Sequence, residues 1–246
     1  NNSWGYNTNA YMALDKAYGS PKDLRDFVAE CHRNGIAVVL DIVFNQTDGL
    51  HPWYQMYPIA SNPFYNEKAP HDYNVLNDVR QDYPLVEQHW ADVLRYWMEA
   101  YKVDGFRFDL VKGLGDNSSY TGNSTDSRNQ SRINRMKRLN DVITSVKADG
   151  IHINELHGQN KEENDNFKNG AQMGWQNLNK TSCQNAMGFE ASSADVKNFN
   201  PGNGGRTFGA AVGYAESHDE VRIAYQMKTY GANANIKYSG AHPGVT

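Results

Sequence analysis

The sequence alternates between apolar runs typical of buried strands and amphipathic runs typical of helices, which restricts the fold more than any other feature. Residues 36–44 are nearly continuous in apolar side chains, as expected for a strand of a parallel sheet that is covered on both faces. A helix is predicted before it, with Ser20 as the N-cap, Pro21 at the first helical position and Gly35 at its end. Strands that alternate with helices predict parallel β-α units.

The same alternation continues along the chain. The further predicted elements are a helix at 84–101, a strand at 103–111, a helix at about 133–146, and strands at 150–155 and 208–217, the last again buried. The pattern is weaker from 158 to 206, where we expect a strand near 171–175 and a helix that starts near 186–189. The polar stretch that follows the first strand is too long for an ordinary connection, so we expect a functional excursion there.

Each predicted strand closes on a polar or acidic residue, namely Asp41, Asp109, Glu155 and Asp219. In a (β/α)8 barrel the chemistry lies at the carboxyl ends of the strands. A doubly wound open sheet also binds its ligands there. However, no glycine-rich phosphate-binding motif follows any of these strands, so the barrel is favoured.

Composition excludes several classes of function. The chain has 246 residues, enough for one barrel or two small domains, and a formal net charge of -4, which argues against nonspecific binding to nucleic acid. It contains no run of about 18 apolar residues, so no membrane span is predicted. Two cysteines, Cys31 and Cys183, make neither a disulfide framework nor a metal site, and Cys31 is expected to be buried in a helix.

Arg107 and Asp109 stand two apart inside an apolar run, so on a strand they point to the same face. A charge there is costly to bury unless it is paired or used. One interpretation is a structural ion pair at the end of a strand. The other is an active site, in which Arg107 keeps Asp109 ionised.

Three carboxylates at the ends of different strands would meet at one barrel mouth. Carboxylates that share a site push their pKa values apart, so one stays ionised while another holds a proton, as glycoside hydrolysis requires. The apolar neighbours of Glu155 are expected to raise its pKa, and His218 and Asp219 to hold sugar hydroxyls. A metal site is the competing interpretation, but the acids are scattered singly and no His-x-His pair follows the first strand.

Together these motifs resemble the α-amylase family of glycoside hydrolases (family 13), which are (β/α)8 barrels that act on α-glucans. Four segments match its motifs in order: 41–46 (DIVFNQ), 105–109 (GFRFD), 154–155 (NE) and 217–219 (SHD). The resemblance implies that Asp109 is the nucleophile, Glu155 the acid/base and Asp219 the carboxylate that stabilises the distorted sugar. It further implies substrate contacts for Tyr6, Gln46, Arg107, Lys112 and His218.

The departures from the family pattern leave the reaction open. Gln46 stands where a sugar-binding histidine is usual, and Gly113 follows Lys112 where many amylases have histidine, so Lys112 is either an aglycone contact or a surface residue. Ser217 replaces an asparagine, which is similar to the glycogen-branching members. The leading interpretation is a retaining α-glucan hydrolase. The alternatives are a branching or other transglycosylating enzyme and a non-catalytic carbohydrate-binding barrel.

No cofactor is predicted to be required. Asn45 matches a calcium ligand of many amylases, but the further oxygen ligands that calcium needs are not found, so Asn45 and Asp41 are expected to be structural residues near the site. His51, His71 and His89 are expected to serve loops and a helix surface. The expected partner is an α-glucan, without nucleic acid or membrane, and the sequence indicates no oligomeric state. A hydrolase slightly favours a secreted or periplasmic location, and a branching enzyme a cytoplasmic one.

The resemblance also implies that residues 1–246 are part of a catalytic barrel, with strands of about the third to the seventh position. Within it, about 47–77 would be a short excursion, reduced from the domain that many relatives carry there. Without the first two strands and the eighth, the barrel would expose raw strand edges, so we expect this stretch to fold poorly by itself.

Overall fold

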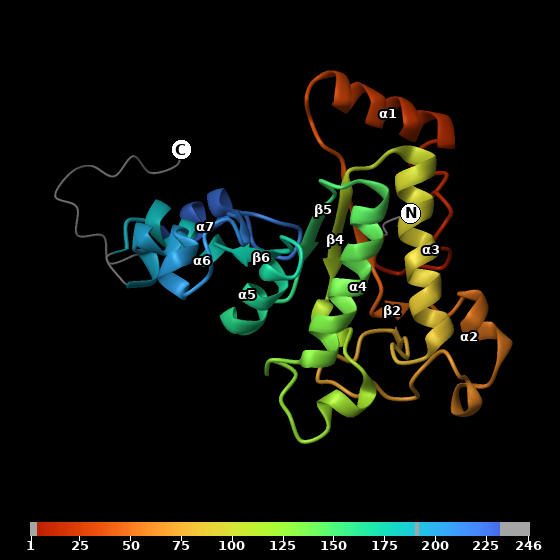
Figure 1. Cartoon of the computed structure of the whole chain (residues 1–246). Coiled ribbons are helices and arrows are strands. Elements are labelled where there is room, and N and C mark those ends of the chain that lie inside the picture. Colours follow the sequence, from red (N-terminus) through yellow and green to blue (C-terminus); the bar gives the residue numbers. More distant parts are fainter. Residues whose placement is uncertain (1–3, 190–191, 232–246) are drawn as a thin grey trace.

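The computed structural model describes residues 4–189 and 192–231 (Figure 1). Five parallel strands form one sheet in the order β1 (Val39–Val43), β4 (Gly105–Asp109), β5 (Ile151–Asn154), β6 (Met173–Asn177) and β7 (Ala211–Tyr214). Neighbours in the sheet follow chain order, and helices connect them. The sheet therefore confirms the predicted α/β class and has the strand order of an open barrel segment.

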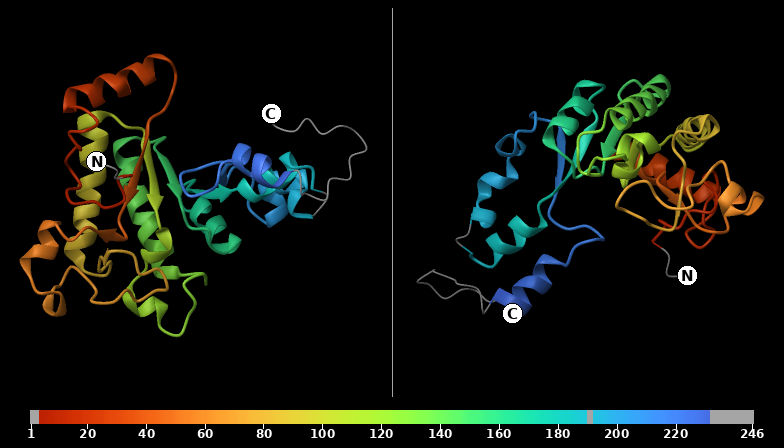
Figure 2. Two further views of the ribbon diagram at one scale, coloured as in Figure 1. Left: turned by 180° about the vertical axis from the view of Figure 1, so that it is seen from behind. Right: turned by 90° about the horizontal axis from the view of Figure 1, so that it is seen from below.

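The main helices are α1 (Pro21–Arg33), α3 (Pro84–Tyr101), α4 (Gln130–Val146), α5 (Asn160–Lys168), α6 (Asn179–Ala186) and α7 (Ile223–Tyr230). Helices α3 and α4 run side by side against the β4 side of the sheet, whereas α6 and α7 lie away from them in every view (Figures 1 and 2). The predicted start of α1 is confirmed, since Ser20 and Asp23 form a reciprocal capping box ahead of Pro21. No helix among residues 4–189 and 192–231 is long and apolar enough to cross a membrane.

The core lies between the sheet and helices α3 and α4. Phe106 and Phe108 of β4 are fully buried on this side, because alternate residues of a strand point to opposite faces. Phe44 stacks on Trp90 of α3, with ring centroids 4.1 Å apart. The same alternation turns Arg107 to the other face, which therefore carries the polar side chains.

The excursion after β1 is closed at its base by a short antiparallel pair, β2 (Gln46–Thr47) and β3 (Asn77–Asp78). Between them lie α2 (Pro52–Met56) and a 3-10 turn at Ile59–Ser61. The other 3-10 turns are at Val111–Gly113, Asn117–Tyr120, Ser192–Ala194, Val196–Phe199 and Pro201–Gly204. The excursion has its own aromatic packing, in which Trp53 stacks on Phe64.

The weakly patterned region holds the errors of the sequence analysis. The helix start expected near 186–189 is wrong, because α6 ends at Ala186 and begins at Asn179. Helix α5 was not predicted, since its sequence NKEENDNFK has no apolar stripe. Strand β7 is only half-buried, because within the described residues it has a partner on one side alone. Cys31 is half-buried rather than buried, and both cysteines are free thiols.

Candidate active site

The guanidinium of Arg107 lies among three carboxylates on the polar face of the sheet. Its Nη1 donates hydrogen bonds to Oδ1 of Asp41 (2.7 Å) and Oδ1 of Asp109 (2.8 Å), and its Nη2 lies 2.9 Å from Oε2 of Glu155. Asp41 is paired with Arg107 in the β1–β4 register, so the two side chains leave the same face. Arg107 is almost completely buried, whereas Asp41 is partly open to solvent.

Glu155 follows the last residue of β5 and is fixed by the turn that follows β4. The Leu110 N–H donates to Glu155 Oε2 at 2.9 Å, and the Val111 N–H donates to the Glu155 carbonyl at 3.0 Å. Leu110 has a positive φ of 44°, a left-handed conformation that is strained for a side chain of this size. This turn directs a backbone N–H at the carboxylate.

The pKa directions of the two carboxyl groups are the reverse of the sequence prediction. Burial raises the pKa of Asp109 to about 7, and the charge of Glu155 adds to this increase, against the opposing effect of Arg107. Burial would also raise the pKa of Glu155, but its contacts with His157 and Arg107 outweigh burial and lower it to about 2. Arg107 acts to lower the pKa of both carboxyl groups, but only at Glu155 is the effect of burial outweighed.

Tyr6 joins the N-terminal segment to the site. Its hydroxyl donates to Asp41 Oδ2 at 2.6 Å, and its ring stacks on His218 with centroids 4.8 Å apart. Asp219 stands beside His218, with Oδ1 3.4 Å from Nε2 of the ring, and its side chain is 56% exposed. Among the described residues, Arg107 forms ion pairs with Asp41, Asp109 and Glu155 but not with Asp219. This third predicted carboxylate therefore lies outside the Arg107 cluster.

Two predicted substrate contacts are bonded to residues outside the Arg107 cluster. Gln46 is buried, and its Oε1 accepts a hydrogen bond from Asn45 Nδ2 at 2.8 Å. Lys112 is also buried, which excludes the surface interpretation, and its ammonium pairs with Asp126 and donates to the Tyr73 hydroxyl. Their predicted roles toward substrate stay predictions.

The residues around Asn45 do not fit a calcium site. Asn45 Oδ1 is a buried oxygen without a hydrogen-bond partner, as a ligand oxygen would be. However, the space beside it is filled: a Cβ at Gly113 would lie 1.6 Å from this oxygen and 2.8 Å from Nε2 of His71. His71 is buried and bonds Asp78 Oδ1 at 3.0 Å, and an imidazole is a poor ligand for calcium. Within the described residues, no group of three or more His, Cys, Asp or Glu side chains could hold a metal.

The other histidines lie where they were expected, His51 and His71 in the excursion loop and His89, half-exposed, on α3. His51 and His71 are buried within the excursion, and Nδ1 of His51 lies 3.1 Å from the hydroxyl of Tyr65. These rings hold the excursion together and lie outside the carboxylate cluster.

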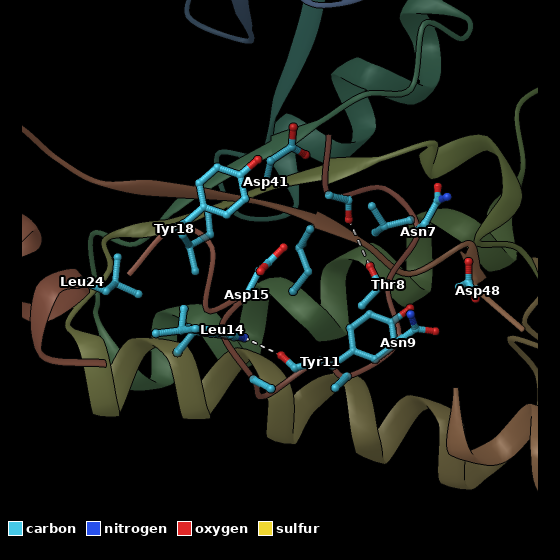
Figure 3. A pocket seen from close by; sticks show the side chains of 17 residues that line it. Asn7, Thr8, Asn9, Tyr11, Leu14, Asp15, Tyr18, Leu24, Asp41 and Asp48 are labelled. Atoms are coloured by element: carbon cyan, nitrogen blue, oxygen red, sulfur yellow. Dashed lines mark hydrogen bonds between the residues drawn. The ribbon is translucent and has the colours of Figure 1, made fainter. Parts of the chain in front are cut away.

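A cavity of about 730 Å³ lies beside the outer edge of β1, between that strand, the N-terminal segment and α3 (Figure 3). Asp41 lies at its rim, next to Tyr18, and is the one member of the Arg107 cluster that lines it. Its other walls include Tyr11, Leu14 and Leu24. The cavity therefore borders the free edge of the sheet, and the carboxylate chemistry lies on the neighbouring polar face.

The structure adds two aromatic residues that the sequence analysis did not consider for the site. Trp175 of β6 lies 5.7 Å from the guanidinium carbon of Arg107, and its ring contacts that of Tyr214 on β7. Burial, together with the charge of Glu220, raises the pKa of Tyr214. The alternation of side chains along a strand indicates which residues of β6 share a face. The register between β5 and β6 is also needed to show that this face is the one that carries Arg107.

A parallel sheet whose strands alternate with helices, and whose polar face holds carboxylates around an arginine near the carboxyl ends of the strands, has the arrangement of the α/β-barrel class. The family model "Alpha amylase, catalytic domain" matches residues 1–73 and 60–238, so the chain belongs to the alpha-amylase family. A curated relative, the glycogen debranching enzyme of Salmonella schwarzengrund (strain CVM19633), is 31% identical over 266 aligned residues. The alignment covers 98% of this chain and 39% of the relative, so the chain spans about two fifths of that protein's length.

Solved structures confirm the barrel fold. The α-amylase of Geobacillus thermoleovorans in complex with acarbose superposes with a TM-score of 0.71 at 20% identity, covering 90% of this chain and 49% of that one. An Anoxybacillus α-amylase superposes with a TM-score of 0.73 at 18% identity, covering 94% and 50%. The five parallel strands are therefore a segment of a (β/α)8 barrel.

Proposed function

We propose that this chain carries the catalytic centre of a retaining glycoside hydrolase that cleaves α-glucosidic bonds in glycogen-like α-glucans. The observation that carries the proposal is the single guanidinium of Arg107 bridging Asp41 within β1, Asp109 at the end of β4 and Glu155 just after β5. Membership of the alpha-amylase family supports the substrate class. The name of the debranching relatives favours branched glucans and hence cleavage at branch points.

In the proposed reaction, the Asp109 carboxylate attacks the anomeric carbon while Glu155 gives its proton to the departing glycosidic oxygen. The glycosidic C–O bond breaks, and a glycosyl ester to Asp109 forms. Glu155 then takes a proton from water, whose oxygen attacks the same carbon and releases Asp109. Asp219 and His218, which lie outside the Arg107 cluster, would hold hydroxyl groups of the sugar ring.

This reaction requires the shared proton on Glu155 and the negative charge on Asp109. In the substrate-free structure the pKa values have the opposite order, because burial raises that of Asp109, whereas His157, Arg107 and the Leu110 N–H outweigh burial at Glu155 and lower its pKa. Two coupled carboxyl groups titrate as a pair, so a modest change in their surroundings can move the proton between them. A bound sugar that displaces water and contacts Glu155 supplies such a change.

A branching transglycosylase is the second candidate, in which a sugar hydroxyl replaces the water. The Ser217–Glu220 sequence (SHDE) favours it, and in the structure Ser217 donates to the Glu220 carboxylate, which also accepts from Tyr214. Incubation with amylose separates the candidates. Reducing ends rise steadily for a hydrolase, whereas branch points appear with few new reducing ends for a transferase.

The proposal is tested by Asp109→Asn and Glu155→Gln in the protein at its natural length, assayed on glycogen, pullulan and amylose. Both variants are expected to lose nearly all activity, and Glu99→Gln, at an exposed position of α3, to retain it. Faster release of reducing ends from glycogen and pullulan than from amylose supports cleavage at branch points. An Asp109→Asn variant as active as the wild type refutes the mechanism.

A further inference from the structure

Trp175 of β6 is a half-buried aromatic residue on the polar face of the sheet, and it belongs to none of the four sequence motifs. Its ring centroid lies 5.7 Å from the guanidinium carbon of Arg107. The ring of Tyr6 lies 6.0 Å from the same carbon. Tyr6 bonds Asp41 of β1, whereas Trp175 belongs to β6, so the two rings approach from opposite sides of β4 in the sheet order.

The strand register places Trp175 beside Glu155. Asn154, the last residue of β5, is paired with Gly174 of β6, so Glu155 and Trp175 are the residues that directly follow this pair in their two segments. Side chains at one level of adjacent strands leave the same face of the sheet. Tyr214 continues this face on β7, with its ring 4.7 Å from that of Trp175 and tilted by 30°.

An indole at this place has two physical effects. Its face attracts a guanidinium, and this attraction favours the orientation in which the guanidinium carbon of Arg107 lies over the ring. Its apolar bulk also keeps water from the neighbouring carboxyl groups, which strengthens every charge interaction among them. Burial is the largest influence on both Asp109 and Glu155, which agrees with such a dry wall.

We propose that Trp175 is a positioning residue that fixes the Arg107 guanidinium and excludes water from the Asp109–Glu155 pair. It acts through Arg107 and the carboxyl groups, without itself contacting the reacting atoms. The inference rests on the proposed glycosidase function and names a residue on which that function depends.

The test is the pH profile of kcat in the natural-length protein with Trp175→Leu and Trp175→Phe. Loss of the aromatic face in Trp175→Leu is expected to lower kcat by roughly 3- to 30-fold, the range of one cation–π contact, with KM within about twofold. Water that enters beside the carboxyl pair makes loss of its proton easier, so the alkaline limb of the profile is expected at lower pH. Trp175→Phe, which keeps an aromatic face, is expected to have most of the wild-type kcat and an alkaline limb close to that of the wild type.

The matched control is Trp53→Leu, the same change at a half-buried tryptophan of the excursion. It is expected to lower the melting temperature without moving the pH profile. The inference is overturned if Trp175→Leu behaves in the same way, with only a lower melting temperature. If Trp175→Leu does not fold, Trp175→Met, which keeps more apolar volume, is measured against the same outcomes.

The two proposals fail separately. An active Asp109→Asn variant refutes the glycosidase mechanism. An inactive Asp109→Asn variant, combined with a wild-type kcat and pH profile for Trp175→Leu, refutes only the role of Trp175.

Discussion

Nη2 of Arg107 lies 2.9 Å from Oε2 of Glu155, although the two side chains arise from different strands. Nη1 of the same guanidinium donates to both Asp41 and Asp109. A planar fork can serve several carboxylates at once, whereas an ammonium is a single point charge. Arg107 is therefore the common ion-pair partner of Asp41, Asp109 and Glu155, and not of Asp109 alone.

Arg107→Lys is expected to impair catalysis while leaving the charge in place. A lysine reaches fewer of the three carboxylates, and the loss of one or two charge-assisted contacts of about 1.5–3 kcal/mol each predicts a fall in kcat/KM of at least about 10-fold. Activity on glycogen and circular dichroism of the purified variant check this. Wild-type kcat/KM in a folded Arg107→Lys protein would contradict the shared role of the fork.

Asp109→Asn is expected to stabilise the protein more at pH 8 than at pH 5. The folded pKa of Asp109 is about 7, above the ordinary 3.8, so its stabilising contribution is complete below the ordinary value and is lost as the pH rises through about 7. Glu155 has a pKa lowered to about 2, so its contribution is present above its ordinary 4.5 and is lost only toward pH 2. Between pH 5 and 8, Asp109 therefore dominates.

Melting temperatures of wild type and Asp109→Asn across this pH range check the sign. Each kcal/mol moves the midpoint by about 2–4 °C in a chain of this size. Glu99→Gln, at an exposed position on α3, is the control and is expected to follow the wild type. A constant difference between wild type and Asp109→Asn from pH 5 to 8 would show that the pKa of Asp109 is not raised.

We propose that folding and activity do not require calcium, because the His71–Asp78 pair occupies the place beside Asn45. Dialysis against EDTA is expected to leave the melting temperature unchanged. His71→Ala is expected to lower stability by about 1–3 kcal/mol, since it leaves the buried carboxylate of Asp78 with one partner fewer. A melting temperature that falls in EDTA and recovers with added calcium would refute this.

The buried pair of Arg132 and Glu162 is expected to be the most sensitive ion pair in the described part of the chain. Both side chains are fully buried, and the guanidinium Nε and Nη2 contact Glu162 at 2.6 and 2.8 Å. Arg132 also donates to the carbonyls of Lys112 and Thr125, so it ties the loop after β4 to α4 and α5. Removal of Glu162 leaves the buried guanidinium of Arg132 without its ion-pair partner.

Glu162→Ala is therefore expected to cost about 3–5 kcal/mol, measured as the change in urea unfolding free energy. Lys137→Ala, which breaks the exposed pair with Asp141 on α4, is the control and is expected to cost under about 1 kcal/mol. The double variant Arg132→Met/Glu162→Leu is expected to recover part of the loss, because it leaves no unpaired charge. Equal costs for the buried and the exposed pair would contradict the structural role of Arg132.

Local signals predicted much of the fold. The apolar runs located β1 and β4, and Ser20 with Pro21 marked the start of α1 correctly. Helix α5 escaped because its sequence has no apolar stripe, and its burial comes instead from Glu162 meeting Arg132 of another helix. A polar helix of this kind cannot be recognised before its partner is known.

The sequence by itself determined that Arg107 and Asp109 share one face, because the period of a strand is two, and that Asp109 and Glu155 lie at the carboxyl ends of β4 and β5. Only the tertiary structure decided that Asp41 and Glu155 meet the same guanidinium, that Trp175 lies beside it, and that burial raises the pKa of Asp109. The physical reason is that register between strands and the burial of a charge are set by contacts between distant segments.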